Sequence, residues 1–560
     1  MKRNIFYIIT VLMSLTLFTS CYDDQDGNDF DSVMPDVLIV IPETAYSGGL
    51  GQTITIDPQI TTNIPESDLE YYWEVQGNRS NDYGRGFYTS LVDMDKQGKT
   101  LNYTCKLDSN ITSLNKSYKC RLRAHQKSTG RDFYSAAGFT LTIQGLSGLM
   151  ILYSDGGSSD VGILMAEEFM PAANSIPENP EVTNALYSSI NGAKIAGVGK
   201  TIVQSVPSSI GWLKEEAKNN CRILVQTTES TVWLNRNDLS LYGDWNAVFY
   251  LQGDRKVNAG NPKGYFHDGS NGYAFDGDDV FIYNPTQQSQ YLFATYTPET
   301  ECNGNCFTFA PLVCDVSTSG IQRLFYANSV NGEKTRKGFV AHSNGMFNDA
   351  PMYTKLLDTA TDAVPFNPGD MKADAVKLFT DQRTHTVGVM KGDAGHPSFA
   401  GKYFFVDIFT KAETAGVSGM QNFPVAILDM SQLTSVNDAI AFDFGTTQNM
   451  YYYATPSVVY HYGLDGNVLT SAQPLCMVDG SALPINGEVT MMKMLRFAGV
   501  TTHNTDEVLV VATWDGAKSH LYALHLDSMT GNVTRISTYD SSTTEGWNIG
   551  KIGDIYIKGL

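Results

Sequence analysis

LMILYSDGGSSDVGILM, residues 149–165, is the stretch that decides the fold. Two apolar runs flank the polar turn DGGSSD, and this pattern predicts a β-hairpin. The alternating residues of the two strands are expected to be buried between neighbouring sheets. Similar hairpins are therefore expected elsewhere in the chain.

Six further segments repeat this unit of a β-run, a polar turn, a second β-run and a longer irregular link. Their starts lie about 50 to 75 residues apart, which leaves room for four strands and a loop in each unit. This period predicts a β-propeller of seven blades, with six or eight as alternatives, each hairpin forming the paired middle strands of a blade. The six segments are RILVQTTESTVWLN from Arg222, GYAFDGDDVFIYN from Gly272, RLFYANSVNGEKTRKGFVAHSNG from Arg323, KLFTDQRTHTVGVM from Lys377, MYYYATPSVVYHYGLDGN from Met450 and VLVVATWDGAKSHLYALHLDSMTGNV from Val508.

The segment IGKIGDIYIKGL, residues 549–560, reads as one strand without a hairpin partner. Beside LMILYSD it would complete the first blade and remove a free sheet edge. The propeller is therefore expected to occupy residues 146–560. A row of further sandwich domains would need a tryptophan-bearing strand about every 100 residues, and the sequence does not show that pattern.

Residues 36–145 have the alternating pattern of a β-sandwich. Its strands are expected in VLIVI, QTITIDP, LEYYWEVQG and SYKCRLRAHQ, followed by an edge hairpin in GRDFYSAAGFTLTI. YYWEV resembles the central tryptophan strand of PKD and immunoglobulin-like modules. Trp73 is expected to pack in the core, the alternative being a binding platform. The predicted fold class is all-β, with an immunoglobulin-like or PKD-like sandwich followed by a propeller.

Residues 1–20 are predicted to be a lipoprotein signal peptide. Lys2 and Arg3 precede an apolar run of about 14 residues, short of the roughly 20 that span a bilayer. Small residues then lead into Cys21, whose thiol would take the diacylglyceryl group and, with further acylation such as palmitate, anchor the mature chain. An ordinary secretory signal or an uncleaved anchor is the alternative.

Residues 21–35 are predicted to be a flexible acidic tether, with Asp23, Asp24, Asp26 and Asp29 following Cys21 closely. This cluster resembles the export signal for lipoproteins on the outer face of the outer membrane in bacteria with Sus-type transporters. The alternative is that the aspartates only solvate the tether. The expected location is the outer membrane, facing the cell exterior.

The chain is acidic, with 39 Lys and Arg against 59 Asp and Glu, a formal charge of −20. Removing Lys2 and Arg3 would make it −22. Such a charge disfavours nucleic acid and anionic membrane surfaces as partners, so membrane contact is expected through the lipid alone.

Cysteines offer two possible disulfides outside the cytoplasm. One would join Cys105 and Cys120 on strands predicted to be neighbours, and the other Cys302 and Cys306 within one loop. A zinc site using Cys302, Cys306 and Cys314 is the alternative, but no fourth ligand stands at a recurrent spacing.

The sequence lacks HExxH, GxSxG, P-loop and helix-opening GxGxxG motifs, and no catalytic residue is predicted. Asp276, Asp278 and Asp279 loosely resemble a calcium loop without its full spacing or distal Glu, so a solvated turn is the first interpretation and structural calcium the second. No other cofactor is expected. Four tryptophans beside Gly or Asp are predicted to bind ligand, or alternatively to fill blade interfaces: Trp212, Trp245, Trp514 and Trp547.

Taken together, the cysteine, the acidic tether, the sandwich, LMILYSDGGSSDVGILM and the C-terminal TWDG…LYAL…TG…GDIYIK blade resemble the PKD-like family of surface lipoproteins. The resemblance implies Sus-type loci, with a TonB-dependent transporter and its lipoprotein lid as partners and a glycan or peptide nutrient as ligand. The expected role is a non-catalytic binding or accessory subunit. A surface propeller hydrolase or lyase, or an adhesive or structural component, is the alternative.

Overall fold

The computed structural model describes twenty-one stretches of the chain, and these form two compact units that are considered separately. Almost all regular structure is β-strand, which confirms the all-β prediction. No helix in these stretches is long and apolar enough to span a membrane. The described residues are 37–49, 53–76, 88–92, 98–106, 110–111, 116–145, 147–169, 179–205, 221–248, 262–267, 272–277, 279–283, 293–296, 307–315, 322–343, 353–357, 365–381, 385–412, 420–445, 450–495 and 508–558.

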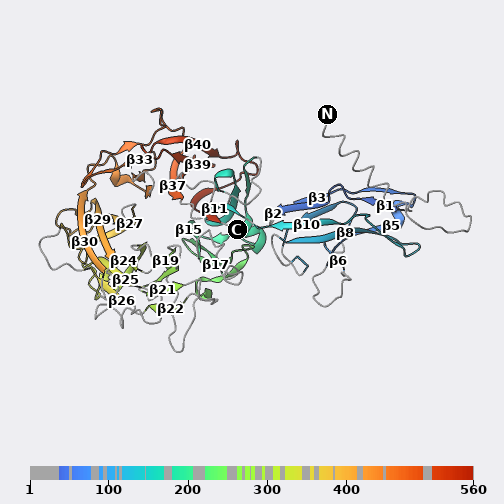
Figure 1. Cartoon of the computed structure of the whole chain (residues 1–560), viewed down its shortest axis with the longest axis horizontal. Helices are drawn as coiled ribbons and strands as arrows, with labels where there is room; N and C mark the ends of the chain where they lie inside the picture. Colours follow the sequence, from blue (N-terminus) through green and yellow to red (C-terminus); the bar gives the residue numbers. More distant parts are fainter. Residues whose placement is uncertain are drawn as a thin grey trace, which may run out of the picture. The chain divides into compact units, whose positions relative to one another are not determined.

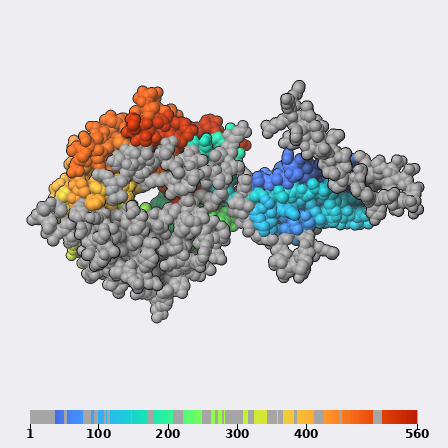
Figure 2. Space-filling view, viewed as in Figure 1, coloured from blue at the N-terminus to red at the C-terminus, as the bar shows by residue number. Residues whose placement is uncertain are grey.

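The first unit is a β-sandwich, whose described strands appear as a continuous blue-to-cyan surface in Figure 2. Its larger sheet has the order β2-β10-β8-β5-β6, with β9 paired to β8, and the smaller sheets pair β1 with β4 and β3 with β7. The elements are β1 (Val37–Val40), β2 (Ala45–Gly49), β3 (Thr53–Ile56), β4 (Gln59–Thr62), η1 (Glu66–Asp68), β5 (Leu69–Gln76), β6 (Tyr88–Ser90), β7 (Leu101–Thr104), β8 (Ser117–Gln126), β9 (Asp132–Tyr134) and β10 (Phe139–Gln144).

Trp73 occupies the core of this sandwich, as predicted. It is fully buried on β5 opposite Leu122 of β8, and its indole Nε1 donates a hydrogen bond of 2.9 Å to the Gly98 carbonyl. The predicted edge hairpin is wrong, because β10 lies between β2 and β8 while β9 pairs separately with β8. The Phe139 ring on β10 packs edge-on against Trp73 at 5.9 Å, so core packing places this strand inside the sheet.

The second unit contains, within the described stretches, seven sheets of at least four strands that follow one another along the chain. We call them blades 1 to 7. Blade 1 consists of β41 (Lys551–Lys558), β11 (Gly148–Asp155), β12 (Ser158–Met165) and β13 (Glu181–Thr183), and blade 2 of β15 (Gly199–Gln204), β16 (Arg222–Thr227), β17 (Thr231–Asn235) and β18 (Leu241–Asp244). Blade 3 consists of β19 (Pro262–His267), β20 (Gly272–Asp276), β21 (Asp279–Tyr283) and β22 (Phe293–Tyr296). Blade 4 consists of β23 (Phe307–Asp315), β24 (Gln322–Val330), β25 (Gly338–Ser343) and β26 (Tyr353–Leu356).

Blades 5 to 7 continue the pattern, and a few short elements decorate the links. Blade 5 consists of β27 (Ala373–Thr380), β28 (His385–Gly392), β29 (Tyr403–Ala412) and β30 (Met420–Asp429). Blade 6 consists of β31 (Ala441–Gly445), β32 (Met450–Ala454), β33 (Val459–Tyr462) and β36 (Gln473–Pro474). Blade 7 consists of β37 (Glu488–Leu495), β38 (Val508–Trp514), β39 (Ser519–Leu526) and β40 (Val533–Tyr539). The short elements are η3 (Glu167–Phe169), α2 (Leu186–Asn191), β14 (Ile195–Ala196), η4 (Trp245–Val248), η6 (Val436–Asp438), β34 (Leu464–Asp465) and β35 (Val468–Leu469).

The blades form a closed ring, seen in Figure 1 as sheets arranged around a centre. Hydrophobic clusters join blade 2 to 3, 3 to 4, 4 to 5, 5 to 6, 6 to 7 and 7 to 1, and β41 contacts β15 across the remaining joint. The middle strands are buried on both faces because a neighbouring blade covers each face, as along β11 and β12. This arrangement is the predicted seven-bladed propeller.

β41 closes the ring as the sequence predicts. It pairs antiparallel with β11, with Leu149 opposite Ile557 and Ile151 opposite Ile555, so blade 1 contains strands from both ends of the propeller sequence. Six of the seven predicted hairpins are middle strand pairs. The hairpin predicted from Lys377 instead consists of β27 and β28, which are the first two strands of blade 5. The middle pair of this blade is β28 and β29.

Candidate functional site

The candidate site lies where three loops of blades 4 and 5 meet. They are the β24–β25 turn, the link from β26 to β27 and the β28–β29 turn. Since neighbouring strands are antiparallel, the turn between a blade's second and third strands lies at the same end as the link to the next blade. Chain topology therefore brings residues 331–337, 365–372 and 393–402 together.

Backbone hydrogen bonds fix the three loops to one another. Met371 N donates to the Lys337 carbonyl at 2.6 Å, and Asp393 N donates to the Lys372 carbonyl at 2.9 Å. Gly338 allows the start of β25 to approach the link from β26 to β27, because a Cβ there would lie 2.6 Å from the carbonyl carbon of Gly369. These bonds make the loops a fixed platform for the side chains they carry.

Lys337, at the end of the β24–β25 turn, connects strand β27 to the β28–β29 turn. Its ammonium group donates to Asp374 Oδ1 at 2.6 Å and to Asp393 Oδ1 at 2.8 Å. Burial acts to lower the pKa of Lys337, but the hydrogen bonds to the two aspartates outweigh it and raise the pKa above its ordinary value. The lysine is therefore charged at neutral pH and holds the Asp393 carboxylate in position.

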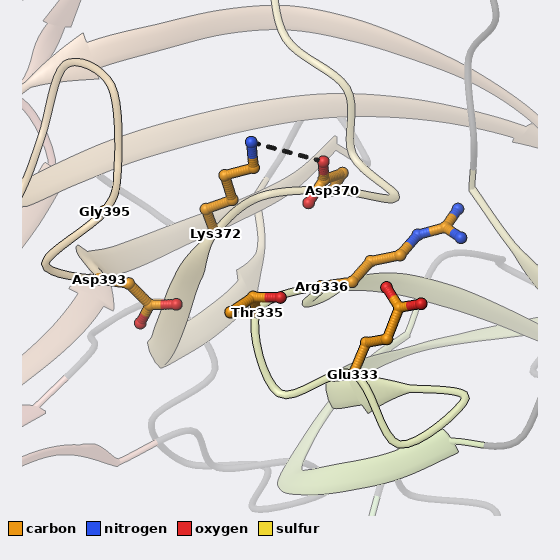
Figure 3. Close-up of a pocket in the computed structure, with 7 residues that line it drawn as sticks. All are labelled: Glu333, Thr335, Arg336, Asp370, Lys372, Asp393 and Gly395. Atoms are coloured by element: carbon orange, nitrogen blue, oxygen red, sulfur yellow. Dashed lines mark ion pairs between the residues drawn. The ribbon is translucent and has the colours of Figure 1, made fainter.

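The loops enclose a cavity of about 380 Å³. Ligand sites commonly measure about 300 to 1,000 Å³, so this cavity is large enough for a small polar molecule. Figure 3 shows Glu333 and Arg336 extending from the β24–β25 turn, with the Lys372 ammonium group 3.9 Å from an Asp370 carboxylate oxygen. The residues that line it are Glu333, Thr335, Arg336, Asp370, Lys372, Asp393 and Gly395.

His396 shapes the β28–β29 turn beside this cavity. Its Nδ1 accepts hydrogen bonds from the backbone N–H groups of Ser398 and Phe399 at 3.1 and 2.9 Å, so this nitrogen is unprotonated. Burial lowers the pKa of His396, although Asp393 acts to raise it. The unprotonated imidazole of His396 therefore stabilises the turn fully above the ordinary histidine pKa of about 6.5. This stabilisation is lost as the pH falls below that value.

Replacing Lys337 by methionine is expected to destabilise the propeller by about 1 to 3 kcal/mol, because Asp374 and Asp393 lose the cation between them. Lys334 on the same turn is exposed and supplies the matched control, Lys334→Met. Urea unfolding at pH 7 measures both variants. Equal midpoints for the two would show that Lys337 does not hold the loops.

The structure assigns two of the four predicted tryptophan sites to the core. Trp245 is 4% exposed and stacks on Trp233 with ring centroids 5.8 Å apart in the cluster between blades 2 and 3. Trp547 is 8% exposed and its Nε1 donates to the Ser519 carbonyl at 3.0 Å, between blades 7 and 1. For these two the ligand-binding prediction is wrong, since blade packing covers their rings. Trp514 is partly exposed at the end of β38, and Trp212 lies outside the described residues.

The predicted calcium loop is a tight turn between β20 and β21. Asp276 is buried opposite Asp279 in the strand register, and Gly277 adopts a left-handed φ of 59°. Asp278 lies outside the described residues. Among the residues described, no group of three or more His, Cys, Asp or Glu side chains is placed to hold a metal ion.

The predicted bridge between Cys105 and Cys120 is absent, and both thiols are free and buried. The reason is topological, because Cys105 follows β7, which pairs with β3, whereas Cys120 belongs to β8 in the larger sheet. The buried Cys314 thiol lies 2.9 Å from the Phe379 carbonyl. Cys302 and Cys306, like Cys21, lie outside the described residues.

Burial raises the pKa of Cys105 to about 11 and that of Cys120 to about 12, so both thiols are expected to be unreactive in the folded protein. Alkylation at pH 8, mapped by mass spectrometry, should label neither residue before unfolding and both after unfolding without a reductant. Cys476 is only partly buried and should react first. Labelling that requires prior reduction would restore the disulfide prediction.

The cavity residues were not among those predicted from the sequence. Their only local signal is the density of charged residues in NGEKTRKG, GDMKAD and KGDAGH. Charged turns are common on surfaces, so this pattern alone does not distinguish a site from solvated loops.

Comparison with curated proteins finds no match to the chain. Among solved structures, the extracellular domain of a putative one-component system from B. thetaiotaomicron is 10% identical over 85% of this chain and 60% of that chain, with a TM-score of 0.21. The chain thus spans less than two thirds of that structure. The WD40 domain of SCAP from fission yeast is 12% identical over 64% and 73%, with a TM-score of 0.29.

The family comparison is confined to the first part of the chain. Residues 21–198 match the PKD-like family, a range that takes in the sandwich and ends immediately before β15 of blade 2. The resemblance expected from the sequence is therefore confirmed over residues 21–198, which are similar to the PKD-like family.

Proposed function

We propose that this protein is a cell-surface lipoprotein that binds a nutrient, a glycan or a peptide, as an accessory of a TonB-dependent transporter and its lipoprotein lid. The observation that carries the proposal is the cavity of blades 4 and 5, where charged side chains stand on loops fixed by backbone hydrogen bonds. Preorganised polar groups recognise a polar ligand without the entropic cost of ordering flexible loops.

The membrane attachment in this proposal rests on Cys21 and the residues around it. The match to the PKD-like family begins at this cysteine, the expected first residue of the mature chain. The acidic tether that follows would lead from the lipid to the sandwich, and the propeller would present the cavity to the medium.

Replacing Cys21 by serine tests the anchor. The variant is expected to lose incorporation of labelled palmitate and to leave the membrane fraction, because serine cannot take the thioether-linked lipid. Cys476→Ser, a substitution far along the chain, should leave both properties unchanged. A Cys21→Ser protein that stays in the membrane fraction with its label would exclude this residue as the lipid site.

A surface hydrolase is the second candidate function, because Glu333, Asp370 and Asp393 place three carboxylates in one cavity. Asp393, however, accepts a hydrogen bond from Lys337 at 2.8 Å, and Asp370 lies 3.9 Å from Lys372, so two of the three carboxylates already contact cations of the protein. Binding is therefore the function that we propose first.

The proposal is tested by isolating the lipidated protein from its native outer membrane in mild detergent and identifying co-purified proteins by mass spectrometry. Recovery of a transporter and its lid is the expected result. Recovery of the protein alone would contradict a stable accessory role. The same preparation incubated with glycans or peptides should bind them without releasing new reducing ends or amines, whereas release would favour the hydrolase.

A further inference from the structure

The β28–β29 turn forms part of the cavity wall. Asp393 and Gly395 lie on this turn and line the cavity, as Figure 3 shows. Two contacts hold Asp393 there, since its backbone N–H donates to the Lys372 carbonyl at 2.9 Å and its carboxylate accepts from Lys337 at 2.8 Å. The shape of the turn therefore decides where this cavity aspartate lies.

His396 closes the turn through hydrogen bonds that only an unprotonated Nδ1 can accept. The donors are the backbone N–H groups of Ser398 and Phe399, at 3.1 and 2.9 Å. A neutral imidazole whose Nδ1 accepts carries its proton on Nε2. Protonation of the ring adds an N–H at Nδ1, so three donors would face one another without an acceptor. Both hydrogen bonds would then be lost.

The backbone connects this part of the turn to the cavity. The Phe399 carbonyl packs against Gly392, where an added Cβ would lie 2.0 Å from the carbonyl oxygen. The His396 N–H also donates to the Asp393 carbonyl at 2.9 Å. Since Gly392 directly precedes Asp393, displacement of Phe399 is expected to displace the cavity aspartate as well.

The surroundings of the imidazole favour its neutral form. Its ring packs against the rings of Phe399 and Phe404, the latter on β29, with centroids 5.2 and 5.1 Å apart. Burial, the largest cause, lowers the pKa of His396, while Asp393 on the same turn acts to raise it and Lys372 on the link from β26 to β27 acts to lower it. The closed turn is therefore fully stabilised above the unperturbed pKa of about 6.5, and this stabilisation decreases as the pH falls below that value.

We propose that protonation of His396 opens the β28–β29 turn and displaces Asp393 from the cavity wall, so that the cavity binds ligand at neutral pH and releases it in acid. This inference rests on the proposed binding function and specifies its regulation. The switch uses no group of the ligand, so it acts equally on a glycan and on a peptide.

Hydrogen–deuterium exchange of the full-length protein in mild detergent, measured by mass spectrometry at pH 7.5 and 5.0, tests the inference. After correction for the intrinsic exchange rate, the amides of residues 393–402 should exchange at least about tenfold faster at pH 5.0. The reason is that the equilibrium constant for opening rises by up to about tenfold for each pH unit below 6.5.

Substitutions of His396 separate its titration from its structural role. His396→Asn should abolish the pH difference, because the asparagine Oδ1 can accept both hydrogen bonds and does not titrate. His396→Ala should exchange rapidly at both pH values, since it offers no acceptor. His125→Asn on β8 of the sandwich is the control and should respond to pH like the parent.

Three outcomes would overturn the inference. They are equal corrected exchange of the parent at the two pH values, a pH response that persists in His396→Asn, and faster exchange of the turn while the amides of Asp393 and Met371 stay protected. Trialanine and maltotriose serve as ligand probes, and one that binds at pH 7.5 should bind more weakly to the parent at pH 5.0 but equally to His396→Asn. Absence of binding by both probes at pH 7.5, with the turn closed, would count against the proposed function and leave the exchange result standing.

Discussion

Removal of residues 551–560 is expected to abolish folding of the propeller. These residues contain β41, whose Ile552, Ile555 and Ile557 are at most 6% exposed. Burial of each isoleucine contributes about 1.5 to 3 kcal/mol. Their sum is comparable with the entire net stability of a folded domain, roughly 5 to 15 kcal/mol. The truncation would also leave β11 with an unpaired edge inside the ring.

Asp554 on the same strand adds polar contacts to the hydrophobic ones. Its Oδ2 accepts from Ile202 N at 2.9 Å in blade 2, and its Oδ1 accepts from Lys493 Nζ at 2.8 Å in blade 7. One carboxylate therefore connects the first strands of three consecutive blades. Loss of β41 removes both of these hydrogen bonds, so blades 2 and 7 are expected to be destabilised as well as blade 1.

The truncated protein should show no cooperative unfolding transition by calorimetry and should elute as aggregate in gel filtration. Adding a synthetic peptide of residues 548–560 should restore part of the transition, because the missing strand can pair from outside. Lys551→Ala, at an exposed position of β41, is the control and should unfold like the parent. A truncated protein with unchanged unfolding would exclude β41 as the closing strand.

The closing strand and the blade repeat were predictable because both are local patterns of apolar residues. IYIK needs a partner strand, and LMILYSD is the first apolar run of the repeat. The register, with Ile555 opposite Ile151, was not predictable, since it depends on a bulge between Leu152 and Tyr153. The Lys377 hairpin was misplaced because three consecutive strands of blade 5 are apolar, and the pattern cannot show which two are the middle ones.

The candidate cavity was beyond prediction for a different reason. Arg336, Lys372 and Asp393 are separated by 36 and 21 positions in the sequence, and only the ring brings their loops together. The tryptophans were misassigned because glycine or aspartate beside a ring indicates a turn, whereas Trp245 and Trp547 reach back from their turns into blade interfaces. Exposure therefore did not follow from the neighbouring residues.

A buried acidic side chain provides a second joint between the first and last blades. Glu168, in η3 after β12, is 5% exposed. Its two carboxylate oxygens accept hydrogen bonds from the hydroxyls of Ser537 and Tyr539 on β40. His525 Nε2 lies 3.6 Å from Oε1, and Arg535 lies 2.9 Å from the same histidine nitrogen. Blade 7 thus supplies the donors that a buried carboxylate requires.

Replacing Glu168 by glutamine is expected to cost about 3 kcal/mol at pH 7. Burial acts to raise the pKa of Glu168, but the hydrogen bonds from blade 7 lower it to about 2, against 4.5 for an ordinary Glu. A depressed pKa stabilises the fold above pH 4.5, and this contribution is lost as pH falls toward 2. The stability difference between parent and variant, measured by urea unfolding, should therefore shrink over that range. Exposed Glu167→Gln is the control and should show no such trend; a difference that stays constant with pH would contradict an ionised Glu168 at this joint.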